Sequence, residues 1–216
     1  MQKKKAIIER KIRYSGKLEP KPIVYIAGEG KNNKTEANYF EAFKSNKYCV
    51  KFIQEGHSDP KGIVKKLKNI IKDKHDIMFR TGIDMAFCLI DTDCDHSKDI
   101  KIKEALDEAK NDQKAAVQIL TSNPCFEIWF ILHERFTSRK YNSSLEVIQE
   151  LRRIDGWKNY EKSDSSTFQR IAGKTSFAID NAKKLERQHI KDGLKPQSVS
   201  FMPSSEVYKL VEILRQ

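Results

Sequence analysis

The chain has 216 residues, and its 41 lysines and arginines outnumber its 30 aspartates and glutamates, which gives a formal net charge of +11. This length is typical of one domain with at most an appendage, and 9 glycines and 6 prolines are too few for a collagen-like or low-complexity protein. No apolar run in the sequence approaches the roughly 20 residues that cross a bilayer. The charged N-terminus is not followed by the apolar core of a signal peptide. We therefore expect a cytoplasmic protein with no membrane association.

From residue 23 onward, short apolar runs alternate with segments of helical periodicity. The runs predict buried strands at 23–27, 48–54, 85–90 and 115–120. Helices are predicted after each run: one with Thr35 as N-cap, one starting at Asp59-Pro60, one around 102–109, and one that Asn123-Pro124 opens. This βαβα order indicates an α/β fold in which a parallel sheet carries helices on both faces.

The last third of the chain shows no comparable strand pattern. Helices are expected around 145–151, 177–185 and 206–214, and 163–167 is expected to be a loop. We therefore divide the chain into a basic arm (1–22), an α/β domain (23–135) and a helical extension packed on it (136–216).

The excess positive charge is concentrated at the N-terminus. A basic arm attracts polyanions because counterions are released when it binds them; a solubilising tail is the alternative. Five residues of the arm are therefore candidates for binding nucleic acid: Lys3, Lys4, Lys5, Arg10 and Arg13.

Acidic residues follow the first and third predicted strands. Glu29 comes shortly after the first strand, and Asp91, Asp93 and Asp95 follow the third. Ligands of open parallel sheets bind beyond the carboxyl ends of the strands, and carboxylates at this spacing suit Mg²⁺ or Mn²⁺. Acids that only face solvent or cap a helix are the alternative interpretation. If the first and third strands are neighbours, Glu29 faces the aspartates.

Three sequence blocks resemble motifs of the RloB-like family. They are Glu29-Gly30 with Lys34-Thr35-Glu36 and Tyr39-Phe40; Asp91-Thr92-Asp93; and Ser122 to Trp129 with Leu132-His133. The tail at 204–214 is similar to the last helix of that family, so the resemblance covers roughly residues 22–214. It implies a Toprim-like fold, which is related to metal-dependent catalytic modules, and it implies a role in restriction-linked or abortive-infection systems, commonly beside an ATPase partner.

The same resemblance assigns roles to individual residues. Glu29 would be the Toprim glutamate, a general acid/base or metal-proximal group, and Asp91 and Asp93 would be the metal ligands. Asn123 and Glu127 would line the same cleft, although Glu127 is also typical of a first-turn helix acid. The chain departs from the pattern where Lys31-Asn32-Asn33 is inserted and where His96-Ser97-Lys98 replaces the usual glycine.

These observations predict an enzyme that hydrolyses phosphodiesters of RNA or DNA with Mg²⁺ or Mn²⁺, in which Lys31 and Lys34 neutralise charge on the phosphate. Such an activity would be toxic to an infected cell. One alternative is a catalytically degenerate subunit that binds nucleic acid or regulates an ATPase-containing complex. A Toprim-type polymerase or primase accessory is the third hypothesis.

Overall fold

The structure is a computed structural model, and it describes residues 20–29, 34–43, 47–53, 59–72, 79–111 and 116–216. The basic residues Lys3, Lys4, Lys5, Arg10 and Arg13, together with Lys31, lie outside the described residues.

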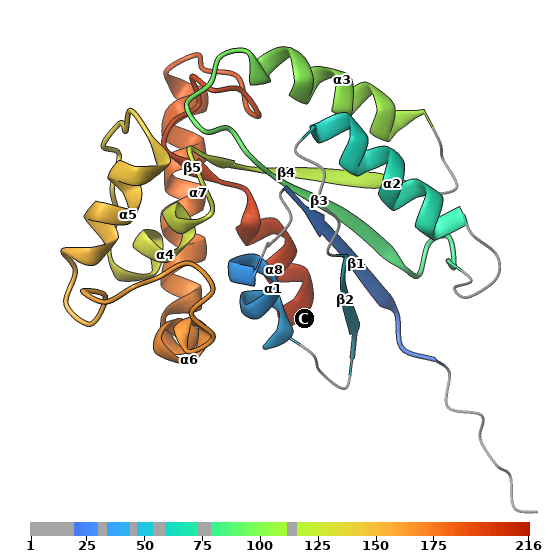
Figure 1. Cartoon of the computed structure of the whole chain (residues 1–216), viewed down its shortest axis with the longest axis horizontal. Helices are drawn as coiled ribbons and strands as arrows, with labels where there is room; N and C mark the ends of the chain where they lie inside the picture. The colour runs from blue at the N-terminus through green and yellow to red at the C-terminus, as the bar shows by residue number, and fades with distance from the viewer. Residues whose placement is uncertain (1–19, 30–33, 44–46, 54–58, 73–78, 112–115) are drawn as a thin grey trace, which may run out of the picture.

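A five-stranded sheet organises the described part of the chain (Figure 1). Its strands are β1 (Ile23–Gly28), β2 (Cys49–Ile53), β3 (Met85–Asp91), β4 (Val117–Asn123) and β5 (Ser204–Ser205). The order across the sheet is β2-β1-β3-β4-β5. The first four strands are parallel, and the two-residue β5 pairs antiparallel with β4. The predicted α/β fold with a parallel sheet is thus confirmed.

Helices follow the strands and then fill the last third of the chain. They are α1 (Lys34–Glu41), α2 (Pro60–Lys72), α3 (Lys98–Lys110), α4 (Glu127–Glu134), α5 (Ser144–Arg152), α6 (Thr167–Ile171), α7 (Thr175–Lys191) and α8 (Val207–Arg215), with a 3-10 turn η1 (Ala172–Lys174) between α6 and α7. The three helices predicted after residue 136 correspond to α5, α7 and α8. No helix in these described ranges has both the length and the apolar character that crossing a bilayer requires.

Two helix starts differ from their prediction, and one agrees. Asp59 caps α2 as expected, because its Oδ2 accepts a hydrogen bond of 2.8 Å from Gly62 N. Thr35 is not an N-cap: it lies inside α1, and its hydroxyl accepts a hydrogen bond of 3.0 Å from Ser163 N. Asn123 does not open α4, because it is still part of β4, where it pairs with Ser204 of β5.

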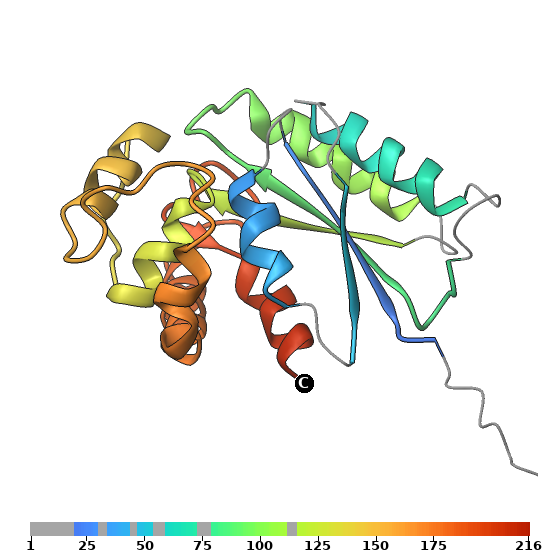
Figure 2. The ribbon, with the colours of Figure 1, turned by 60° about the horizontal axis from the view of Figure 1, so that its bottom comes forward.

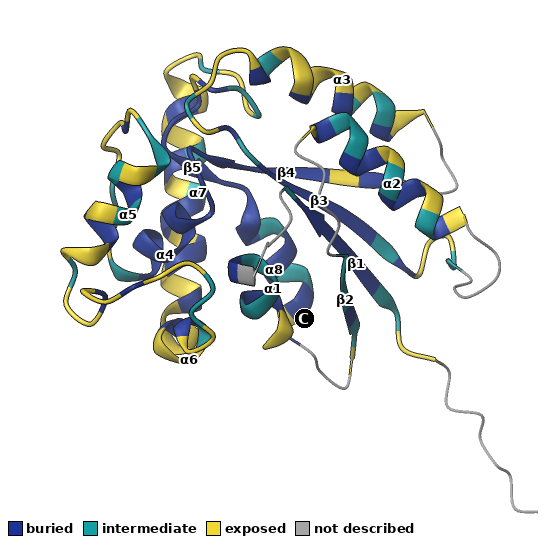
Figure 3. Ribbon diagram, in the orientation of Figure 1, coloured by how far each residue is buried: buried dark blue, intermediate teal, exposed yellow. Residues whose placement is uncertain are grey.

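The strands bury side chains on both faces of the sheet, as expected for parallel strands covered by helices. Tyr25 and Ala27 face α2 and α3, whereas Val24 and Ile26 face the helices on the opposite side. Figure 2 shows α2 and α3 lying together over one face, with α1 and α8 below the other. In Figure 3 the strands are mostly dark blue, because both of their faces are covered.

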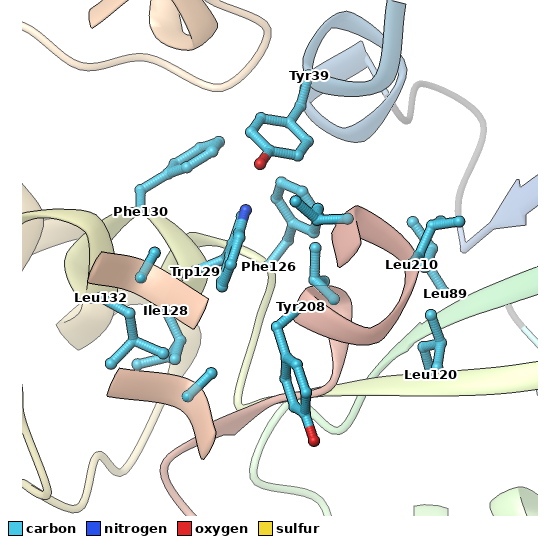
Figure 4. Packing of buried hydrophobic residues seen from close by; sticks show 14 of the residues in the cluster. Tyr39, Leu89, Leu120, Phe126, Ile128, Trp129, Phe130, Leu132, Tyr208 and Leu210 are labelled. Carbon is cyan, nitrogen blue, oxygen red and sulfur yellow. The ribbon is translucent and has the colours of Figure 1, made fainter. Parts of the chain in front are cut away.

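Aromatic side chains dominate the larger core. The Tyr39 ring lies 5.7 Å from Phe126 and 6.1 Å from Phe130, so that α1 packs against α4 (Figure 4). Trp157, from the segment between α5 and α6, stacks on Phe130 at 5.5 Å with the planes 27° apart. The helical extension and the sheet therefore share one hydrophobic core.

We expect Phe130→Ala to lower the free energy of unfolding by about 3–5 kcal/mol, the usual cost of removing a fully buried aromatic ring. Phe130 has no exposed surface. The matched control is Phe177→Ala, since Phe177 is 49% exposed and its removal should change stability by at most about 0.5 kcal/mol. Denaturant unfolding followed by near- and far-UV circular dichroism measures both. Because the core is shared, the two signals should change together; separate transitions would contradict a shared core.

Candidate active site

The acidic residues that follow β1 and β3 lie at the same edge of the sheet. The two strands are hydrogen-bonded neighbours, with Gly28 of β1 paired with Leu89 of β3. Glu29 therefore follows β1 close to the point where Asp91 ends β3. The first and third strands are thus neighbours, which is the condition under which the sequence placed Glu29 opposite the aspartates.

A lysine joins the two strand ends. Lys98, the first residue of α3, donates three hydrogen bonds of 2.7 Å each: to Glu29 Oε2, to Asp93 Oδ2 and to the backbone oxygen of Asp91. Burial by itself would lower the pKa of Lys98, but the bonds to Asp93 and Glu29 outweigh it and raise the pKa. The ammonium therefore stays charged, and all three of its donors are used inside the protein.

Glu29 is held in a setting that disfavours its charged form. Burial raises the pKa of Glu29 from 4.5 to about 7, although Lys98 counteracts part of the shift. Its second oxygen, Oε1, is buried and has no hydrogen-bond partner. A carboxyl group that titrates near neutral pH suits general acid/base catalysis.

Asp91 lies among other carboxylates. Its pKa is raised well above the ordinary value, first by burial and then by repulsion from Glu36, Glu127, Glu29 and Asp93. Part of the residue still touches solvent, but its carboxylate is deep enough for burial to be the main cause. Carboxyl groups that lie so close together that ionising all of them is energetically unfavourable are typical of functional sites.

Glu127, at the start of α4, is 1% exposed and only partly satisfied. Its Oε1 accepts a hydrogen bond of 3.1 Å from Tyr160 and lies 3.6 Å from Lys162 Nζ, while Oε2 is buried without a partner. Glu36, in the first turn of α1, belongs to the same group of acids, because Glu127 and Glu29 help burial to raise its pKa to about 7.

The remaining predicted acids differ in their surroundings. Asp93 has a positive φ of 52° and is half-exposed; its Oδ1 accepts a hydrogen bond of 3.1 Å from Ser144. Asp95 is exposed, and its two oxygens accept hydrogen bonds of 2.8 Å from the backbone and hydroxyl of Ser97. Those bonds lower the pKa of Asp95. The structure therefore groups Asp93 with Lys98 and Glu29, and gives Asp95 the bonds of a turn before α3.

Asn123 does not line the cleft as predicted. It is 1% exposed, and its side-chain oxygen accepts a hydrogen bond of 2.7 Å from Thr92. Its amide nitrogen donates to the backbone oxygens of Ser198 and Val199. With these bonds Asn123 ties the end of β4 to the loop before β5, so a contact with nucleic acid is not supported. Lys34 begins α1, but its side chain is not among the described ones.

Sequence reasoning gave no role to Glu36, Lys98, Tyr160 or Lys162. The signal for Glu36 was present, because it stands in the first of the three motif blocks. Lys98 had a weaker signal: it belongs to the segment His96-Ser97-Lys98, at which the sequence departs from the expected pattern. Tyr160 and Lys162 gave none, since a segment more than 120 residues away from Glu36 in the chain has no pattern that links it to the site.

The donor atoms of this acidic site suit a hard divalent cation. Carboxylate oxygens are what Mg²⁺ and Mn²⁺ prefer, and the buried oxygens Glu29 Oε1 and Glu127 Oε2 lack partners that such an ion would supply. Over the described ranges, however, no three His, Cys, Asp or Glu side chains already stand in a metal-binding arrangement. The carboxylate oxygens of the site are suitable ligands for such a cation, but their side chains would have to rotate to bind it.

The fold and this site define a class of protein: α/β domains in which carboxylates gather at the carboxyl edge of a parallel sheet. The chain belongs to the RloB-like protein family, whose pattern it matches over residues 24–214. Comparisons with curated proteins and with solved structures found no match.

We expect Asp91→Asn to stabilise the protein at pH 8. Because the folded-state pKa of Asp91 is raised, the folded protein binds a proton that the unfolded chain releases, and the free energy of unfolding falls as pH rises above about 4. Asparagine does not ionise, so the variant does not lose this stability as pH rises. Thermal denaturation should show a melting temperature about 2–4 °C higher at pH 8, equivalent to about 1 kcal/mol, and no gain at pH 4.

Asp93→Asn is the matched control for this measurement. Asp93 is half-exposed and paired with Lys98, so its replacement should bring no gain at pH 8. Equal pH profiles for wild type and Asp91→Asn would contradict the repulsion described for the acidic site.

Proposed function

We propose that the protein is a divalent-metal-dependent nuclease that hydrolyses phosphodiester bonds of RNA or DNA. The observation that supports this most is the gathering of Glu29, Glu36, Asp91 and Glu127 from three separate segments, with two buried oxygens that have no partner. Replacing any one of these acids with a neutral residue would remove its repulsion with the others. A site that keeps such repulsion is typical of one whose ligand compensates it.

The proposed roles follow from the surroundings of each residue. Asp91 and Asp93, with Glu127, would hold the ion, which when bound would polarise a phosphate and lower the pKa of a bound water. Glu29, with a pKa of about 7, would exchange a proton with the attacking water or the leaving oxygen near neutral pH. Lys98 donates a hydrogen bond to each of Glu29 and Asp93 and so holds the two carboxylates beside each other.

The net charge of +11 supports a polyanionic substrate, because a basic protein attracts nucleic acid over long distances. Family membership supports the biological setting: we propose that the nuclease acts as the toxic effector of an anti-phage or abortive-infection system, beside an ATPase partner.

One observation favours a second candidate function, a catalytically degenerate subunit that binds nucleic acid or regulates the ATPase. The Lys98 ammonium already lies between Glu29 and Asp93, so an internal cation satisfies the two carboxylates that a metal would use. A protein of this kind would bind nucleic acid and leave it intact.

Metal binding has a readout that does not depend on activity. We expect saturating Mg²⁺ or Mn²⁺ at pH 8 to raise the melting temperature of the wild type. At a hundredfold excess over the dissociation constant, the free energy of unfolding should increase by about 2.7 kcal/mol. Asp91→Asn should abolish the shift, whereas Asp95→Asn should keep it because Asp95 binds Ser97. A metal-independent melting temperature in the wild type would contradict the proposed ion site.

Cleavage is tested with labelled tRNA and with plasmid DNA. We expect products in Mg²⁺ or Mn²⁺, none in EDTA, and a loss of at least about 100-fold in Asp91→Asn, as when a group that stabilises the transition state is removed. Full activity of Asp91→Asn, or activity in EDTA, would refute the assignment. A metal-insensitive mobility shift without products would favour the binding subunit.

A further inference from the structure

The segment Trp157–Asp164, between α5 and α6, joins the two helices that carry Glu127 and Glu36 (Figure 2). At its start, Trp157 Nε1 donates a hydrogen bond of 2.9 Å to Glu134 of α4. At its end, Ser163 binds α1 twice: its backbone N donates to Thr35, and its oxygen accepts a bond of 2.8 Å from Asn38. We call this segment the strap.

Two side chains of the strap point at Glu127. Tyr160 is 1% exposed and donates its hydroxyl to Glu127 Oε1. The side chain of Lys162 is 57% exposed, and its ammonium lies 3.6 Å from the same oxygen, which is too far for a hydrogen bond. The strap thus supplies one buried contact to Glu127 and one cation that faces solvent above it.

The two lysines of the acidic site differ in the donors that they have left. Lys98 uses all three for protein oxygens. In the described part of the chain, no acceptor lies within hydrogen-bonding distance of Lys162 Nζ, so its three donors remain for a ligand. An anion that approaches Glu36, Asp91 and Glu127 meets repulsion, which the exposed ammonium beside Glu127 offsets.

We propose that Lys162 contacts the substrate and binds a phosphodiester group of nucleic acid beside Glu127, and that Tyr160 is a positioning residue for Glu127. This inference rests on the proposed function and adds to it, because it makes the helical extension a part of the site. RNA and DNA share the phosphodiester chemistry, so both serve as probes.

The test compares Lys162→Met, Lys162→Arg and the matched control Lys158→Met, an exposed lysine on the same strap. Fluorescence anisotropy measures binding of a short labelled single-stranded RNA, and of the DNA with the same sequence, over a range of salt concentrations in Ca²⁺ and in EDTA. Loss of one phosphate contact should reduce the slope of log K against log salt by about 0.7. We expect this for Lys162→Met only.

Cleavage kinetics test the two roles separately. Lys162→Met should raise KM. Tyr160→Phe keeps the ring that packs against Trp157 and Phe130 but loses the bond to Glu127, so it should lower kcat and leave the salt slope unchanged. Thermal denaturation of each variant identifies any that does not fold.

The outcomes distinguish this inference from the proposed function. A folded Lys162→Met that keeps the wild-type slope and KM, while the wild type binds and cleaves, overturns the inference alone. A wild type that neither binds nor cleaves overturns both. A reduced slope in Lys162→Met that Lys162→Arg restores supports the substrate contact, even if no cleavage is found.

Discussion

Mutual repulsion among buried carboxylates is the constraint around which the site is arranged. Asp91 has its pKa raised by burial and by Glu36, Glu127 and Glu29, and either protonation or a neighbouring cation relieves this repulsion. Among the residues that the structure describes, two ammonium groups lie beside these acids: that of Lys98, fully engaged with Glu29 and Asp93, and that of Lys162, half-exposed beside Glu127.

The hydrophobic core holds these charges in place. Phe126, just before α4, packs edge to face against Tyr39 of α1 and against Phe130 of α4, and Tyr39 and Phe130 pack at a tilt. These contacts keep the first turns of both helices at the carboxyl edge of the sheet. The strap adds Trp157 and Tyr160 to the same aromatic cluster. A rigid apolar frame of this kind is what permits like charges to stay close together.

The strands and helices that are marked by a pattern in their own sequence were predicted correctly. Apolar runs identified four strands, and Asp59-Pro60 identified the start of α2. Errors occurred where a tertiary contact overrides the local signal: Asn123 continues β4 because Ser204 pairs with it, and Thr35 uses its hydroxyl for Ser163. Two-residue β5 exists only through its pairing with β4, so no pattern in the sequence indicates it.

By itself, the sequence determined the α/β class, the position of Glu29 and Asp91 at strand ends, and family membership, because periodicity and motif spacing are local properties. Only the tertiary structure decided which charged groups meet there. It brought in Glu36, Lys98 and Lys162, and it gave Asp95 and Asn123 other partners. Electrostatic interactions depend on distance and burial, and the folding of separated segments sets both.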